Sequence, residues 1–161
     1  MKKMLLAGLL VFSSVLLSAA EESFQVGFWF GVPAETVRSD VEGIKLGIPV
    51  SSGEGKVAGA ELSILCSATK HLTGFQWAWF GLTSTNDLKG VQLSFLNLSN
   101  RLSEGLQLGI LNHSAKRGFQ WGLINHCSNN ARFQLGLINV NKDGWLPIMI
   151  FVNFGKGTFE G

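Results

Sequence analysis

One octapeptide, present in three successive copies, decides the fold of this chain: GLQLGILN at residues 105–112, GFQWGLIN at 118–125 and RFQLGLIN at 132–139. In the first copy one side of the pattern carries Leu106, Leu108 and Ile110, and the other carries Gly105, Gln107, Gly109 and Leu111. Bulky apolar residues that recur with a period of two are typical of a β-strand. The glycines also disfavour a helix.

Looser copies of the octapeptide extend the pattern over most of the chain. They are SFQVGFWF (23–30), GIKLGIPV (43–50), GAELSILC (59–66), GFQWAWFG (74–81), GVQLSFLN (90–97) and GWLPIMIF (144–151). Short polar stretches with turn composition separate the copies. Removing these turns leaves nine candidate strands, many of ~9 to 11 residues, which is the length of a membrane-crossing β-strand.

The pattern predicts an all-β fold, a tandem-repeat antiparallel meander closed as a small β-barrel of eight or nine strands. Gly-φ-Gln-φ-Gly, where φ is apolar, reads the same in both directions, so antiparallel neighbours would place like residues side by side. A parallel β-solenoid is the alternative, with Asn97, Asn112, Asn125 and Asn139 stacked in a ladder. A two-layer β-sandwich is a third possibility. The solenoid is disfavoured because a seven-residue strand leaves only about seven residues for the return path.

A polar column is the most distinctive feature of the repeats. It consists of Lys45, Glu61, Gln76, Gln92, Gln107, Gln120 and Gln134. In a barrel these side chains line the lumen while Leu, Phe, Trp and Ile face lipid, which predicts a bilayer as a partner. The column is interpreted as an amide ladder rather than a pore lining, because so small a barrel is filled by its own side chains.

The amino terminus has the form of a secretory signal. Two lysines precede an apolar run that ends in small residues, so cleavage is expected after Ala20. The predicted organisation is a signal peptide at 1–20, one β-repeat domain at 21–154 and a flexible tail at 155–161. Cleavage leaves 11 basic residues against 11 acidic ones. With no basic cluster, the chain is not expected to bind nucleic acid.

Few residues of the chain are candidates for metal binding or catalysis. His113, His126 and Cys127 could hold a metal only if the strands are parallel, and they are interpreted as polar residues entering turns. No nucleophile, base and acid occur in a catalytic pattern. The chain is therefore predicted to be non-enzymatic, without catalytic residues, metal or cofactor. Whether Cys66 and Cys127 form a disulfide is left open, as are the protein or small-molecule partner and the oligomeric state.

At its repeats the chain resembles exported bacterial surface-repeat proteins of unknown function, which are built from tandem Gly-[Leu/Val]-Gln-[Leu/Ile]-Gly-[Leu/Ile]-[Val/Ile]-Asn units. Its closing segment, residues 141–154, is similar to the way those proteins end, with Gly-Trp-Leu-Pro and Asn-Phe. The resemblance covers roughly residues 24 to 154. It implies a cell-envelope or surface location. With the predicted barrel we expect an outer-membrane protein with a structural or surface role, and with the solenoid a secreted surface protein that acts in binding or adhesion. It brings no catalytic residues.

Overall fold

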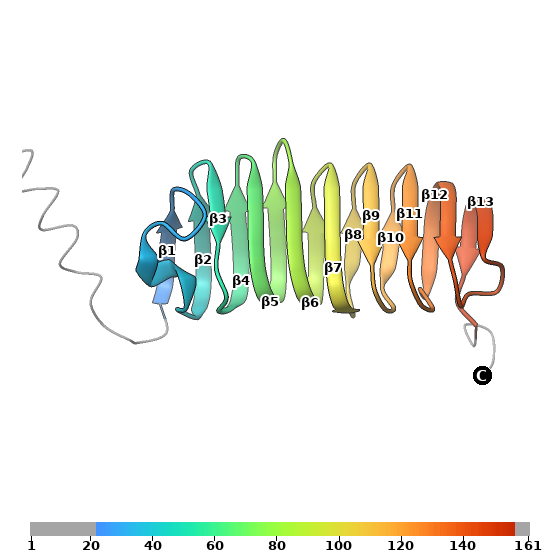
Figure 1. Cartoon of the computed structure of the whole chain (residues 1–161), viewed down its shortest axis with the longest axis horizontal. Helices are drawn as coiled ribbons and strands as arrows, with labels where there is room; N and C mark the ends of the chain where they lie inside the picture. Colours follow the sequence, from blue (N-terminus) through green and yellow to red (C-terminus); the bar gives the residue numbers. More distant parts are fainter. Residues whose placement is uncertain (1–21, 157–161) are drawn as a thin grey trace, which may run out of the picture.

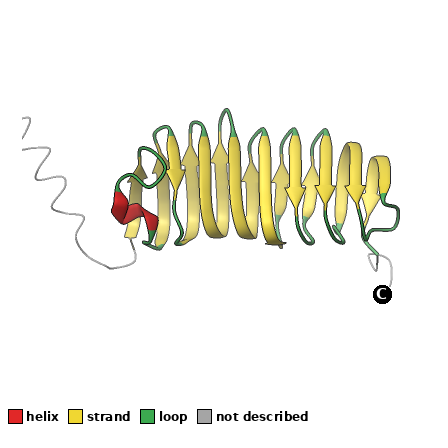
Figure 2. Cartoon of the chain, in the orientation of Figure 1, coloured by secondary structure: helices red, strands yellow, loops and turns green. Residues whose placement is uncertain are grey.

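The computed structural model describes residues 22–156, which form an elongated stack of β-coils (Figure 1). Its thirteen strands are β1 (Glu22–Gly27), β2 (Val41–Gly47), β3 (Val50–Ser52), β4 (Lys56–Ser63), β5 (Cys66–Ala78), β6 (Leu82–Leu93), β7 (Leu96–Ser103), β8 (Leu106–Leu108), β9 (Leu111–Ser114), β10 (Phe119–Trp121), β11 (Ile124–Cys127), β12 (Phe133–Asn141) and β13 (Ile148–Phe154). The one helix among these residues is the short 3₁₀ helix η1 (Ala34–Val37), near the start of the stack (Figure 2).

Strand pairing identifies the fold as a parallel β-solenoid. Within residues 22–156 every pair of named strands is parallel except β12 with β13. Register partners repeat at the same place in each coil: Gln25, Lys45, Glu61, Gln76, Gln92, Gln107, Gln120 and Gln134 follow one another across the sheet. These eight positions mark eight coils. The predicted antiparallel meander closed as a barrel is therefore wrong, and the alternative, the solenoid, is the fold.

The prediction failed because each of the first eight copies of the octapeptide contains a corner, whereas the ninth, GWLPIMIF, contains none and ends inside the antiparallel strand β13. Leu106–Leu108 forms β8 on one face, the chain bends after Gly109, and Leu111–Ser114 forms β9 on the other face. The repeat thus supplies its own return path, which removes the objection that too few residues remain for it. The symmetry of Gly-φ-Gln-φ-Gly, which reads the same in both directions, does not distinguish the two folds, because parallel stacking places Gln beside Gln just as antiparallel pairing does.

Each coil has two faces joined by two corners. We call the face that carries β8 and β10 the first face and the face that carries β9 and β11 the second face. Strands β5 and β6 each run from the second face of one coil into the first face of the next, as their two sets of partners show. At the corner after the first face, a Cβ on Gly122 or Gly136 would lie within 2.1 Å of a carbonyl oxygen of the preceding coil, so these positions require glycine.

The interior is filled largely by amides. Along the first face each glutamine donates from Nε2 to Oε1 of the preceding one: Gln92 to Gln76, Gln107 to Gln92, Gln120 to Gln107 and Gln134 to Gln120, at 2.7–2.9 Å. Along the second face Asn97, Asn112, Asn125 and Asn139 form a similar ladder at 2.8 Å. In-register stacking of identical amides makes such ladders possible. A small apolar cluster of Val41, Val57, Leu72 and Leu88 fills the early coils.

The two ends of the stack depart from the repeat. At the start, residues 28–40 with η1 take the place of a second-face strand. At the other end, β13 pairs antiparallel with β12 and covers both faces of the last coil. Terminal repeats of solenoids are commonly atypical in this way because they close an otherwise open stack. Gly155 also bridges to Gly144. The expected signal peptide at 1–20 and residues 157–161 of the expected tail lie outside the described residues.

Candidate interaction surface

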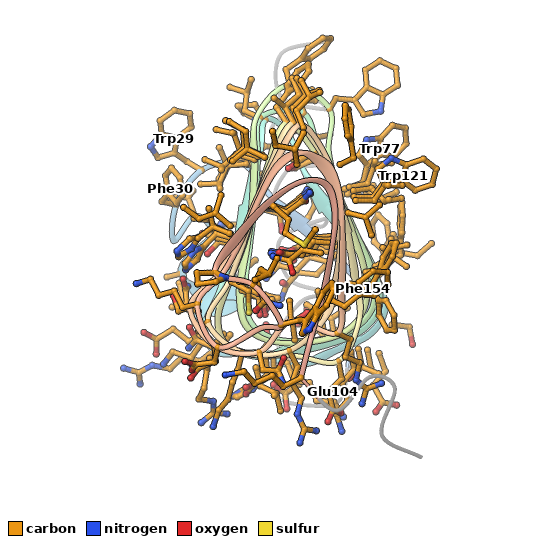
Figure 3. The ribbon with its side chains drawn as sticks, turned by 90° about the vertical axis from the view of Figure 1, so that its right-hand side faces the viewer. Trp29, Phe30, Trp77, Glu104, Trp121 and Phe154 are labelled. Carbon is orange, nitrogen blue, oxygen red and sulfur yellow. The ribbon has the colours of Figure 1, made fainter. Side chains whose placement is uncertain are left out.

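The corners that follow the first face line up into one continuous apolar ridge, which we call the apolar edge. Its exposed side chains are Phe28, Val32, Ile48, Ile64, Leu65, Trp79, Phe80, Phe95, Ile110, Leu111, Leu123, Ile124, Leu137 and Ile138, while Trp29 and Phe30 lie on the adjoining flank of the first coil (Figure 3). Each is 40–63% exposed. Contiguous exposed apolar surface of this extent is rare on soluble monomers and marks a site of interaction.

The corner geometry explains why these side chains point outward. Ile110 and Leu111 are consecutive and both exposed, whereas the next residue, Asn112, is buried. The expectation that Leu111 shares a side with Gln107 is therefore wrong, because the alternation is interrupted at the bend. Two adjacent apolar residues between a glycine and an asparagine are the sequence signal for this corner.

Backbone groups along the apolar edge are hydrogen-bonded from coil to coil. Examples of N–H donors and carbonyl acceptors are Leu65 to Pro49, Phe80 to Ile64, Leu96 to Gly81, Ile110 to Phe95, Ile124 to Ile110 and Ile138 to Leu123, at 2.9–3.1 Å. Polar backbone groups without partners would make transfer of this edge into an apolar medium unfavourable. These hydrogen bonds remove that obstacle.

The opposite corners carry charge, and we call them the charged edge. Lys70 bonds Glu54 at 3.1 Å. The Asp87 carboxylate accepts from Arg101 and from His71, and the Arg101 hydrogen bond is the main reason that the pKa of Asp87 is lowered. Viewed along the stack, aromatic and aliphatic side chains gather at one edge and charged ones at the other, near Glu104 (Figure 3). The molecule is thus amphipathic across its width.

The predicted polar column lies inside the coils and not in a lumen. All seven members, Lys45, Glu61, Gln76, Gln92, Gln107, Gln120 and Gln134, are at most 1% exposed. The glutamine amides of the column hydrogen-bond to one another and to backbone carbonyls. Gln107 Nε2, for example, donates to His113 O. No external ligand can reach them without unfolding a coil.

Two members of this column are ionisable. Glu61 accepts hydrogen bonds from Ser51 Oγ at 2.5 Å and Gln76 Nε2 at 2.7 Å, while Lys45 Nζ donates to Ser52 O at 3.1 Å. Burial raises the pKa of Glu61 and lowers the pKa of Lys45, and the attraction between the two charges opposes both shifts. The pair stands in register between Gln25 and Gln76.

The suspected metal ligands are only partly brought together. His113 and His126 stack with ring centroids 4.9 Å apart and Nδ1 atoms 2.7 Å apart. Cys127 instead points into the coil and is fully buried. Burial lowers the pKa of both imidazoles. Within residues 22–156 no group of three or more His, Cys, Asp or Glu side chains is placed to hold a metal ion. Cys66 and Cys127 are free thiols.

Comparison with known proteins gave no relatives: no family model, curated protein or solved structure matches this chain. In the described part of the chain, no helix is both long and apolar enough to span a membrane.

Proposed function

We propose that this chain is an exported, non-enzymatic β-solenoid of the bacterial cell envelope that binds a lipid bilayer through its apolar edge. The observation that carries the proposal is the uninterrupted apolar edge whose backbone is already hydrogen-bonded. The signal-like amino terminus and the resemblance to exported surface-repeat proteins support the location.

The proportions of the edge suit a shallow, lengthwise association. Coils spaced by about 4.8 Å place the first and eighth roughly 34 Å apart. The side chains of the apolar edge project from the corners of the coils. They would therefore enter the boundary between headgroups and acyl chains, as interfacial elements do. Trp79 on this edge and Trp29 beside it are of the residue type favoured at that depth.

Charge distribution predicts which lipids matter. The segments that form the apolar corners, such as 47–50, 94–96, 109–111 and 122–124, contain no charged residue. Because the ionised groups lie on the opposite edge, attraction to anionic headgroups contributes little. Binding should therefore occur on neutral phosphatidylcholine vesicles and persist when the salt concentration is raised.

Vesicle flotation tests the proposal. Phe95→Ser/Leu123→Ser removes two half-exposed side chains from the apolar edge, and Phe24→Ser/Ile44→Ser removes two of similar exposure from the flat first face. We expect the edge variant to lose about 2 kcal/mol of binding free energy, roughly 30-fold in partitioning, and the face variant to bind like the parent. Failure of the parent to float with neutral vesicles, or equal losses in both variants, would overturn the proposal.

A further inference from the structure

A hollow of about 560 Å³ lies beside the last coils, on the flank between the first face and the charged edge. Six of its lining residues give it its character: three phenylalanines, Phe119, Phe133 and Phe154, and three cations, Arg117, Arg132 and Lys156. Phe154 is seen on this flank in Figure 3. A volume of this size is typical of sites for small organic ligands.

Stacking of the coils and the antiparallel last strand build the aromatic wall. Phe119 and Phe133 are register partners in β10 and β12, and Phe133 is paired with Phe154 in β13. The Phe133 and Phe154 rings meet edge to face with centroids 5.5 Å apart. Three segments far apart in the sequence thus present their rings to one space.

Contacts around the hollow position the backbone of Lys156 and the guanidinium of Arg132. Asn130 fixes Lys156 from both sides, because its Nδ2 donates to Lys156 O at 2.9 Å and its Oδ1 accepts from Lys156 N at 2.8 Å. The Arg132 guanidinium lies 6.0 Å from the centre of the Phe119 ring. That distance is the outer range of a cation–π contact, which orients the guanidinium beside the aromatic wall.

Arg117 has a strained backbone at the mouth of the hollow. Its φ is +59°, in the left-handed region that a long side chain rarely occupies. Its carbonyl accepts from Ser114 Oγ at 3.0 Å and from Cys127 Sγ at 3.9 Å, which holds this conformation. Observed strain of this kind is concentrated at functional sites.

Charge at this end of the solenoid is unbalanced. Residues 101–156 contain six basic side chains and two acidic ones, Glu104 and Asp143, and neither of these two acids lines the hollow. Arg117 forms an ion pair with Glu104 at 3.9 Å, and its members are 56% and 38% exposed. Such a pair is worth little and can be exchanged for a ligand anion.

We propose that this hollow binds an amphipathic organic anion, a carboxylate, sulfonate or phosphate attached to an aromatic or short aliphatic body. The acidic group would be met by Arg117 and Lys156, since charge-assisted hydrogen bonds to such cations are strong. The apolar body would pack against Phe119, Phe133 and Phe154. This site is separate from the apolar edge and does not depend on membrane binding.

Calorimetric titration of the exported protein with naphthalene-2-sulfonate, and with the neutral naphthalene-2-sulfonamide as control ligand, tests the proposal. We expect the sulfonate to bind at one site and the sulfonamide at least tenfold more weakly, about 1.4 kcal/mol. Arg117→Gln and Lys156→Gln should each lower sulfonate affinity about tenfold, whereas Lys70→Gln, on the charged edge and paired with Glu54, should leave it unchanged.

Equal binding of both ligands, equal losses in Lys70→Gln, or no binding of the sulfonate by the parent would each overturn the proposal. Lys156→Gln keeps the backbone contacts with Asn130, so it remains informative if Arg117→Gln fails to fold. Both pocket variants should still float with neutral vesicles, which separates failure of this site from failure of the apolar edge.

Discussion

The early and late coils of this solenoid share one backbone path but have different interiors. The late coils place Gln and Asn ladders inside, and successive glutamines from Gln107 to Gln134 are 13 and 14 residues apart. Early coils use 15 to 20 residues and add an apolar cluster, Val41 to Leu88, and a buried Lys45 and Glu61. The difference shows that the coil tolerates either filling, provided that most buried polar groups find a partner. Among the described residues, three buried side-chain oxygens have none: Gln25 Oε1, Ser103 Oγ and Gln134 Oε1.

Substitution of the buried charged residues in the early coils should cause the largest loss of stability. Glu61→Gln removes the stronger of the two carboxylate attractions on buried Lys45 and leaves only that of Glu22, so we expect a loss of about 3–5 kcal/mol in the free energy of unfolding. Lys45→Gln/Glu61→Gln converts this stretch to the late-coil type, and its stability should return to within about 1 kcal/mol of the parent. Urea unfolding of the three proteins measures both values; a double variant no more stable than the single would contradict the comparison.

Breaking the amide ladder of the late coils should cause the next largest loss of stability. Gln107→Leu removes the donor to Gln92 Oε1 and the acceptor of Gln120 Nε2. An orphaned buried polar group costs about 1–3 kcal/mol, so we expect a total loss of about 2–4 kcal/mol in unfolding free energy. Leu88→Ala, in the apolar cluster, should lose a similar amount. If Gln107→Leu is neutral in urea unfolding, hydrogen bonding does not hold the late coils together.

A smaller, pH-dependent effect should distinguish the late coils from the early ones. The pKa values of His113 and His126 are lowered in the folded protein, chiefly by burial and also by Lys142. The unfolded chain therefore binds protons first, so stability is fully present above the ordinary histidine pKa of about 6.5 and declines as the pH falls below it. The urea midpoint should drop between about pH 7 and pH 5, and the drop should be smaller in His113→Leu/His126→Leu. An identical pH profile in the variant would rule out this pair as the cause.

The smallest effect is expected on the charged edge. Lys70→Gln breaks the ion pair with Glu54, in which both side chains are about half exposed. Exposed pairs contribute between 0 and about 1 kcal/mol, so thermal unfolding should change little. A loss comparable to that of Gln107→Leu would mean that the charged edge, and not the interior, stabilises the stack.

Much of the fold follows from the sequence, but strand direction does not. The alternation around Gln107 predicts a strand, and the recurrence of the octapeptide predicts like residues stacked on like. Both observations hold equally for parallel and antiparallel neighbours. The decisive signal is local: Ile110 and Leu111 interrupt the alternation, and a corner at that point turns one predicted strand into two.

The candidate surfaces were harder to predict for the same reason. Without the corner, Leu111 belongs to the interior and the apolar edge does not exist. The basic and aromatic hollow depends on β13 reversing direction, which brings Phe154 and Lys156 beside Phe133 and Arg132. No spacing in the sequence encodes that contact. By contrast, the stacking of His113 on His126 follows directly once the strands are known to be parallel.

Site-directed spin labelling on vesicles tests most directly the claim that the apolar edge meets the bilayer. One nitroxide is placed by Leu123→Cys on the apolar edge and another by Arg101→Cys on the charged edge, since Cys66 and Cys127 are buried. On neutral vesicles the label at residue 123 should become more accessible to oxygen and less accessible to a water-soluble nickel complex, while the label at 101 stays in water. Two labels that remain equally accessible to nickel, or a label at 101 that enters the lipid, would contradict the account.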